Sequence, residues 1–234
     1  MKFVGIDGCR AGWFLLGLND DGAGNFRLLK HIVELDAYLD AVEVVLIDVP
    51  IGLRGRHPEE RVCDKQARAV LRPNRGSCVF PAPSRCALQC ETYEEASKRN
   101  KECTGRGLSK QSFAIMPKIR EVDQYLADVR RRPKVHEMHP EVCFWALNGQ
   151  KPMQYNKKKK EGYAERIAIL IKHDSQARDW IEMAMRAYAR AEVARDDIVD
   201  ALVGAIIARN TQSLRRFPDN PEKDEVGLPM EIVY

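Results

Sequence analysis

The sequence Phe3-Val-Gly-Ile-Asp-Gly-Cys9, followed by Gly12-Trp-Phe-Leu-Leu-Gly-Leu18, decides the fold. Phe, Val and Ile favour strands, and two apolar runs joined by a tight return predict a pair of antiparallel strands. Asp7 lies near the end of the first run, flanked by Gly5 and Gly8, where a ligand or another backbone can approach closely. Asp7 is therefore a candidate to hold a metal ion or to face a phosphate. A turn aspartate that bonds its own backbone is the alternative, and this stretch alone does not decide between them.

A second acid follows another buried strand. Residues 25–33 predict a third antiparallel strand, and residues 34–41 predict a short helix. The apolar run Val44–Ile47 then predicts a strand covered on both faces, as in a parallel sheet, and Asp48 closes it. A strand, a crossover helix and a new buried strand predict two parallel neighbours. Asp7 and Asp48 are thus expected at adjacent strand ends, where such sheets bind ligands. An acid that simply ends a strand before a proline turn is the alternative.

Three further acids begin a late helix. Asp196, Asp197 and Asp200 precede or interrupt a segment, residues 198–208, that is almost wholly apolar or small, so we expect this helix to be packed on most sides. The helix dipole favours acids at this end, which is the alternative to a functional role. Asp197 and Asp200 are three residues apart and share a face. Because a buried carboxylate without a cation is costly, we interpret these acids as partners of the strand-end acids around a divalent metal.

Residues 134–139 predict a short strand, and a helix opens near Glu141. Period-2 alternation places Val135, Glu137 and His139 on one face. Glu137 and Glu141 are candidates for the same site. A helix-start acid favoured by the dipole is the alternative for Glu141, and a buried, hydrogen-bonded histidine is the preferred interpretation of His139.

The segment from 53 to about 132 differs from the rest and is interpreted as an insertion. Between residues 51 and 110 it contains 13 Lys and Arg against 7 Asp and Glu. Residues 59–71 and 109–130 predict helices. The basic residues can hold a nucleic-acid backbone or another phosphate-rich substrate, and a solvated basic surface is an equal alternative. A further basic run, Lys157–Lys160, precedes a predicted helix that contains Ile167, Leu170 and Ile171. Residues 175–194 predict another helix.

Composition supports one globular domain. The 234 residues are 44% hydrophobic and 31% charged with a net charge of +4, which is compatible with a polyanionic partner. We interpret residues 1–212 as a single domain with its insertion, and residues 213–234 as a tail with one edge strand. No apolar run reaches the length of a membrane span and no signal peptide is evident, which predicts a cytoplasmic protein without membrane contact. Seven irregularly spaced cysteines then predict reduced thiols, and the absence of a CxxC pair argues against zinc.

Four segments, GIDGCRAGW, DVPIG, EMHPEVCFWALNG and DDIVDA, together resemble a family of unknown function that is classed as a predicted RNase H-fold nuclease. The resemblance runs from about Phe3 to Asn210, and the late Asp-x-x-Asp also resembles Holliday-junction resolvases. It implies an RNase H-like α/β fold: a mixed sheet with an antiparallel three-strand meander plus parallel strands, flanked by helices, with the basic helical insertion. The resemblance also implies nuclease activity. For this family the activity is itself a prediction from the fold and the acids, and fold alone does not fix function.

The leading hypothesis is a metal-dependent nuclease that hydrolyses phosphodiester bonds by a two-metal carboxylate mechanism. Carboxylate ligands favour Mg²⁺ or Mn²⁺, and the partner would be DNA, RNA or another phosphodiester. Asp7 would be shared by both ions, Asp48 would hold one, and Asp197 with Asp200 the other. Additional site candidates are Glu137, Glu141 and Asp196, and candidate phosphate contacts are Arg10, Arg54, Arg75 and Lys157.

Two other functions remain open from the sequence. A non-catalytic nucleic-acid-binding or scaffold protein on the same fold is the second hypothesis, and salt-sensitive binding without metal-dependent turnover would favour it. An actin-like or sugar-kinase-type ATP-binding protein also opens with a Gly-Ile-Asp-x-Gly turn. That class needs two such lobes and a late glycine-rich adenosine motif, and this chain lacks the motif.

Overall fold

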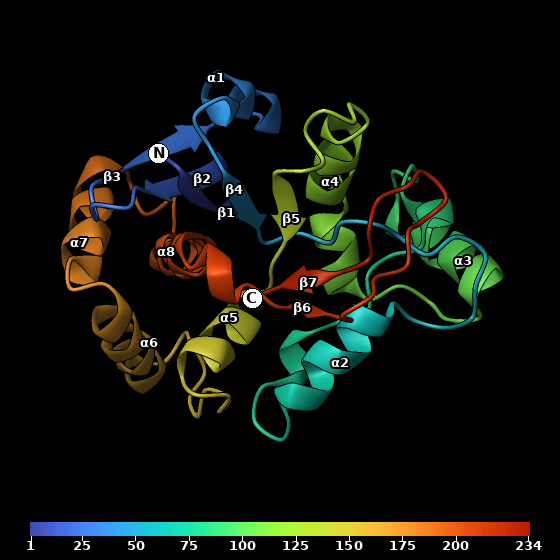
Figure 1. Cartoon of the computed structure of the whole chain (residues 1–234). Coiled ribbons are helices and arrows are strands. Elements are labelled where there is room, and N and C mark those ends of the chain that lie inside the picture. Colours follow the sequence, from blue (N-terminus) through green and yellow to red (C-terminus); the bar gives the residue numbers. More distant parts are fainter.

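A computed structural model describes residues 1–234 and has a five-stranded sheet at its centre. The strands are β1 (Phe3–Cys9), β2 (Gly12–Leu18), β3 (Gly24–Leu29), β4 (Val44–Ile47) and β5 (Val135–Glu137). They lie in the order β3-β2-β1-β4-β5 (Figure 1). β1, β2 and β3 pair antiparallel, whereas β4 pairs parallel to β1 and β5 parallel to β4. The predicted mixed sheet, with its antiparallel meander and parallel strands, is confirmed.

The third strand is shorter than the sequence predicted. It ends at Leu29 rather than at residue 33, because the chain turns into the 3₁₀ helix η1 (Ile32–Leu35) and then into α1 (Asp36–Leu39). Ile32 and Leu35, three residues apart, are both buried in this turn. The Glu34 carboxylate accepts the backbone N–H of His31 at 3.0 Å and so caps it. The apolar residues after Leu29 therefore follow helical rather than strand spacing.

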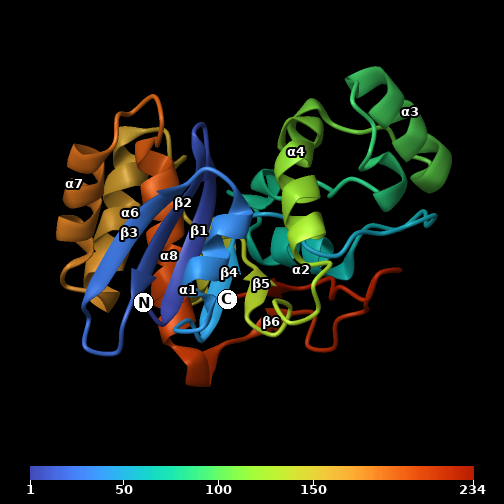
Figure 2. The same ribbon diagram turned by 90° about the horizontal axis from the view of Figure 1, so that it is seen from above.

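One face of the sheet is covered by a helical layer. It contains α5 (Pro140–Leu147), α6 (Lys160–His173), α7 (Ala177–Ala187) and α8 (Arg195–Arg209). α8 packs directly on β1, β2 and β4, and α6 and α7 lie outside it (Figures 1 and 2). Every residue from Ile198 to Ala208 is buried, as predicted. α7 ends at Ala187, before the expected residue 194, because the chain turns there and the Glu192 carboxylate accepts the N–H of Ala189.

α8 approaches β1 more closely than side chains would allow. A Cβ atom added to Gly5 would lie 1.9 Å from the Ala201 carbonyl oxygen, and one added to Gly204 would lie 3.2 Å from the Gly5 Cα. Gly5 is therefore required by the contact itself, and a side chain at Gly204 would be tightly packed against it. The backbone of the strand that contains Asp7 rests directly on the backbone of the helix that contains Asp200.

The insertion lies on the side of the molecule where β4 and β5 are, away from α6 and α7 (Figure 2). Its helices are α2 (Val62–Val70), α3 (Tyr93–Thr104) and α4 (Lys110–Tyr125), with the short 3₁₀ turns η2 (Gly76–Cys78) and η3 (Arg85–Ala87). α2 and α4 lie within the predicted ranges 59–71 and 109–130, with later starts and earlier ends. The buried side of α4 packs on the face of the sheet opposite α8.

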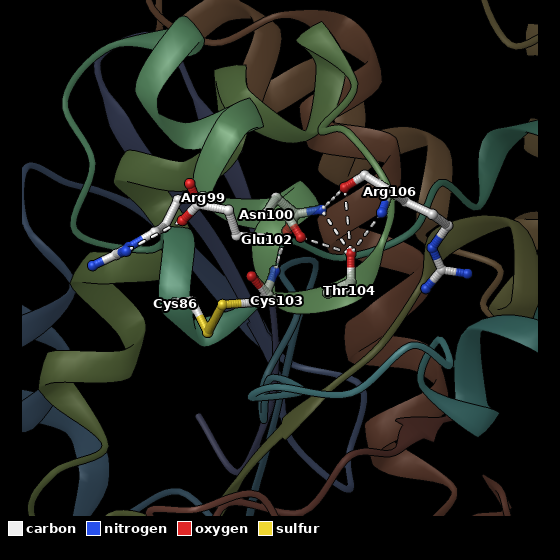
Figure 3. Close-up of a disulfide and its surroundings, with 8 residues drawn as sticks. Cys86, Arg99, Asn100, Glu102, Cys103, Thr104 and Arg106 are labelled. Carbon is white, nitrogen blue, oxygen red and sulfur yellow. Dashed lines mark hydrogen bonds and ion pairs between the residues drawn. A yellow bond between two sulfur atoms is a disulfide. The ribbon is translucent and has the colours of Figure 1, made fainter.

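A disulfide joins Cys86 in η3 to Cys103 near the end of α3, with 6.7 Å between their Cα atoms (Figure 3). The expectation of reduced thiols throughout is wrong for this pair, since the insertion brings two cysteines 17 residues apart into contact. The other five cysteines are free. Beside the disulfide, Asn100 donates to the Arg106 carbonyl at 2.8 Å and accepts the N–H of Ser84 at 2.8 Å. These contacts hold the outer part of the insertion together.

The C-terminal segment is packed against the body of the protein. It contains two short strands, β6 (Arg216–Phe217) and β7 (Ile232–Val233), which pair with each other, rather than the one edge strand that we expected. Between them, Asp224 accepts the backbone N–H of Leu53 at 3.0 Å and forms an ion pair with Arg85. Glu231, which precedes β7, also pairs with His136 of β5 at 2.9 Å, so the segment links the sheet to the insertion. None of the helices combines the length and the apolar character that crossing a bilayer requires.

Candidate metal centre

The strand register brings the first two acids together. β1 and β4 are parallel with Ile6 opposite Ile47, so Asp7 and Asp48, one residue further along each strand, are neighbours at the same sheet edge. Alternation also places them on the same face. Phe3 and Leu46, which precede Asp7 and Asp48 by even numbers of residues, belong to the core between the sheet and α8. Both carboxylates therefore project toward α8.

α8 supplies the third acid. The close backbone contact with β1 places Asp200, in the second turn of the helix, over the ends of the two strands. One carboxylate oxygen from each of Asp7, Asp48 and Asp200 lies within 4.8 Å of the others. We call these three residues the acidic triad. Asp7 and Asp200 are buried and Asp48 is half-buried.

Burial and mutual repulsion raise the pKa values of the triad. Burial, followed by the Asp48 and Asp200 charges, raises the pKa of Asp7 well above its ordinary value. Burial and then Asp200 raise the pKa of Asp48 to about 7. The pKa of Asp200 is also raised by burial, although Lys157 opposes the rise. Three carboxylates held this close are disfavoured in the ionised form unless cations are present.

The protein itself provides little compensation for these charges. The Lys157 ammonium forms an ion pair and a hydrogen bond with Asp200. Asp7 and Asp48 accept no side-chain hydrogen bond in the structure. Three carboxylates thus face one ammonium, which leaves two negative charges when all are ionised. The neighbouring carboxylates, Asp200 first, outweigh the effect of burial and hold the pKa of Lys157 above its ordinary value.

The triad lies at the end of a cleft of about 490 Å³ between the sheet edge and the insertion, which we call the main cleft. Asp7 and Asp48 line its floor, and Arg75 and Phe80 come from the insertion wall. Lys118 of α4 also lines it, with its ammonium 4.1 Å from the centre of the Trp13 ring. The insertion therefore encloses the acids rather than lying apart from them.

The structure separates two predicted acids from the triad. Asp197 accepts the backbone N–H of Ala194 at 2.8 Å and so caps the start of α8. Burial raises its pKa to about 6, but it is not among the three converging carboxylates. Asp196 is half-buried and lines a different cleft from the strand-end acids. Both therefore lie in the first turn of α8, one turn before Asp200, and do not belong to the triad.

Glu137 belongs to a second buried cluster. It is aligned with Ile47, so its side chain leaves the sheet on the face opposite the Asp48 carboxylate. There Arg61 donates to both Glu137 oxygens, at 2.7 and 2.8 Å, and to both Asp64 oxygens, at 3.1 and 2.6 Å. Glu137 also accepts the N–H of Ile51 at 2.6 Å. Burial raises the pKa of Glu137 to about 7, and Arg61 opposes that rise. We call Arg61, Asp64 and Glu137 the arginine cluster.

Glu141 lies in the first turn of α5 and is held from behind by Arg166. Its Oε1 accepts from the Arg166 guanidinium at 2.5 Å, and both side chains are buried. Its Oε2 has no hydrogen-bond partner and lies 3.6 Å from Arg75 Nε. Glu141 lines the main cleft. It is therefore positioned by a buried arginine, and its second oxygen is buried beside Arg75 without a hydrogen bond.

The four predicted phosphate contacts fall in different places. Arg75 and Lys157 line the main cleft. Arg10 is exposed in the turn between β1 and β2. Arg54 forms an ion pair with Glu222 of the C-terminal segment and lines a smaller cleft in the insertion. Only two of these basic side chains are thus brought to the acids.

Sequence reasoning missed several residues of the cleft. Arg61 had no distinguishing signal among the basic residues of the insertion. Lys118 was equally inconspicuous in a long helix. His139 was interpreted as a buried, hydrogen-bonded histidine, yet its Nδ1 is buried with no partner and its side chain lines the main cleft. Burial lowers the pKa of His139, so the neutral ring is favoured.

A family model described as "Protein of unknown function (DUF429)" matches residues 5–223. The chain belongs to this family. No curated protein and no solved structure matches this chain. The family description assigns no activity.

The donor set of the triad fits a hard divalent cation. All three groups are carboxylates, which Mg²⁺ and Mn²⁺ prefer over the nitrogen and sulfur ligands of zinc. The two uncompensated negative charges match one such ion. Asp7, Asp48 and Asp200 are therefore the residues that would hold it, and the capping role of Asp197 leaves no comparable set for a second ion.

Proposed function

We propose that this protein is a metal-dependent nuclease that hydrolyses phosphodiester bonds on an RNase H-like fold. The observation that carries the proposal is the convergence of Asp7, Asp48 and Asp200 within 4.8 Å with a single ammonium as counter-charge. Structural acids are normally paired or hydrogen-bonded when buried. This triad is better explained by a cation that the protein binds for chemistry.

The topology supports the fold assignment. The order β3-β2-β1-β4-β5, with an antiparallel meander followed by parallel strands, is the arrangement implied by the family resemblance. The acids fall at the ends of β1 and β4 and on the late helix α8, in the same sequence order as in that resemblance. The support from fold remains analogy, so the chemistry must rest on the site.

Mg²⁺ or Mn²⁺ bound by the triad would polarise a phosphodiester and lower the pKa of a coordinated water. The protein's own residues then have distinct tasks. Arg75 and Lys118 supply positive charge along the main cleft for a phosphate group. Lys157 pairs with Asp200 and lines the main cleft, where its charge can attract a phosphate group. Glu141, with one free oxygen, and the neutral His139 can each hold or accept a proton from a water in the cleft.

The direct test is hydrolysis of bis(p-nitrophenyl) phosphate and of a labelled oligonucleotide, with and without Mn²⁺. We expect turnover that depends on the metal and is lost, by about 10³-fold or more, in Asp7→Asn and Asp200→Asn, which equals about 4 kcal/mol of transition-state stabilisation. Asp196→Asn is the matched control, because it lies on the same helix start outside the triad. Full activity in Asp7→Asn would reject the proposal.

A non-catalytic nucleic-acid-binding protein is the other outcome of this test. It would show salt-dependent binding of the oligonucleotide with no turnover in any metal. Wild-type protein that binds Mn²⁺ through the triad but hydrolyses neither substrate would favour it.

A further inference from the structure

A second cleft, of about 320 Å³, adjoins the triad on the side of α6 and α8, and we call it the basic cleft. Lys157 and Lys158 line both clefts. Asp7 and Asp48 line the main cleft, whereas Asp200 lines the basic cleft. The triad therefore contributes residues to both clefts, which share Lys157 and Lys158.

The basic cleft has unpaired positive charge. Arg190 and Lys158 are exposed and Arg195 is half-buried, and none of the three makes an ion pair or a side-chain hydrogen bond. The Arg195 guanidinium lies 3.8 Å from the centre of the Tyr163 ring, a stacking contact that restricts its conformations. Asp196 is the one acid of this cleft outside the triad. Guanidinium groups held in this way are suited to bidentate contacts with phosphate oxygens.

The main cleft is different in shape and lining. Its volume of about 490 Å³ is within the range of pockets for a single small organic ligand, roughly 300–1,000 Å³. Phe80 and Ile115 give it an apolar wall beside the charged floor. A cleft of this size accepts one nucleotide and is too small for a base-paired duplex. Buried Asp7 and Asp200 likewise require that the reacting phosphate enter a confined space.

We propose that the two clefts bind one single strand of nucleic acid across the triad. One nucleotide occupies the main cleft, and the phosphates that follow it lie against Lys158, Arg190 and Arg195 in the basic cleft. The phosphate between them lies at Asp7, Asp48 and Asp200, and this last statement rests on the proposed nuclease function. The substrate class is therefore single-stranded or locally unpaired nucleic acid rather than continuous duplex.

Binding can be measured without cleavage, in EDTA, by fluorescence anisotropy of a labelled short oligonucleotide. Separate arms use single-stranded DNA, single-stranded RNA and the corresponding duplex. We expect tighter binding of a single strand than of the duplex, and the DNA and RNA arms identify which sugar is preferred. The double variant Arg190→Gln/Arg195→Gln should lose about tenfold in affinity, and its log–log salt dependence should become shallower by about 1.4, since each phosphate contact contributes about 0.7 for single strands.

The matched control is Arg178→Gln/Arg186→Gln, which removes the same charge from exposed positions of α7 outside both clefts. The single variant Arg190→Gln, at an exposed residue, provides a test that does not disturb the Tyr163 contact and should lose about threefold. Equal affinity in the two double variants, or preference for duplex in the wild type, would overturn the inference.

The outcome is separable from that of the proposed function. Wild-type protein that binds single strands through Arg190 and Arg195 but never hydrolyses a phosphodiester would leave the binding inference standing and reject the nuclease. Metal-dependent hydrolysis of bis(p-nitrophenyl) phosphate with no loss of strand binding in the double variant would support the proposed hydrolase chemistry and reject the binding inference.

Discussion

The acidic triad and the arginine cluster are two sets of buried or half-buried acids that lie on opposite faces of the same sheet edge. In the arginine cluster every oxygen of Asp64 and Glu137 accepts a hydrogen bond from Arg61. In the triad, Asp7 and Asp48 accept none from any side chain, and only Asp200 has a cation, Lys157. Both sets combine several carboxylates with one basic side chain. The carboxylate oxygens are fully hydrogen-bonded in the arginine cluster and mostly without hydrogen bonds in the triad.

This difference distinguishes acids that stabilise the fold from acids that we expect to bind a ligand. A buried acid whose oxygens are all bonded to an arginine has its charge compensated in the folded protein, so it needs no further ligand. A set of converging acids without donors destabilises the fold unless something else binds there. The arginine cluster is thus expected to be required for folding, and the triad for activity at a cost in stability.

The largest expected effect is on the arginine cluster. Arg61→Met would leave Asp64 and Glu137 buried without their partner, which should reduce the free energy of unfolding by about 3–5 kcal/mol. Urea denaturation followed by circular dichroism measures it. Lys65→Met, in the neighbouring helix α2, removes an exposed pair with Glu59 and should cost no more than about 1 kcal/mol. Similar losses in both variants would remove the distinction between the two sets.

The second effect is stabilisation by metal, which only the triad should show. At about a hundred times its dissociation constant, Mn²⁺ should raise the free energy of unfolding by about 2.7 kcal/mol at pH 8. At pH 5 the effect should be much smaller, because protons compete for carboxylates whose pKa values are raised, that of Asp48 to about 7. Differential scanning calorimetry with and without EDTA tests this. Equal stabilisation in Asp48→Asn would place the ion elsewhere.

A smaller effect of opposite sign to Arg61→Met is expected in the metal-free protein. The folded pKa of Asp48 is about 7, above its ordinary value of 3.8, so the folded state binds a proton that the unfolded chain has released. Stability should therefore fall as the pH rises from about 4 to about 7. Asp48→Asn should flatten this fall and be more stable than wild type at pH 8. We expect a gain of about 1–2 kcal/mol, less than the full pKa shift would give, because Asp48 is half-buried and solvent screens its charge. A destabilised Asp48→Asn in EDTA would contradict the assignment.

The smallest predicted effect concerns Lys157, the one ammonium bound to the triad. Lys157→Met removes a positive charge next to the proposed cation, so Mn²⁺ should bind about threefold to tenfold more tightly, which is about 1 kcal/mol. Isothermal titration calorimetry measures the affinity. The exposed Lys159→Met serves as control. Weaker binding in Lys157→Met would show that Lys157 supports the ion rather than competing with it.

Parts of this site could be predicted from the sequence, for physical reasons. The neighbouring positions of Asp7 and Asp48 follow from the right-handed strand-helix-strand crossover and from the apolar runs that precede each acid. The burial of α8 follows from its continuous apolar pattern. Asp197 could not be separated from Asp200 in this way, because its role depends on a cap to Ala194 that helical periodicity does not encode.

Pairing between distant side chains was also beyond the sequence. Glu137 was predicted as a site residue because alternation places it on one face with His139, but the side of the sheet to which that face turns depends on its alignment with Ile47. Its partner Arg61 is one of many basic residues in the insertion, and nothing local marks it. The disulfide between Cys86 and Cys103 likewise depends on the packing of η3 against α3.

The contact between Gly5 and Gly204 has a consequence for how the acids are spaced. Because main chain touches main chain there, the distance from the strand that bears Asp7 to the helix that bears Asp200 is set without any intervening side chain that can adopt another rotamer. A single methyl group at Gly5 would act as a wedge, moving α8 outward and opening the space between the carboxylates. Two residues without functional side chains therefore determine how far apart the Asp7 and Asp200 carboxylates lie.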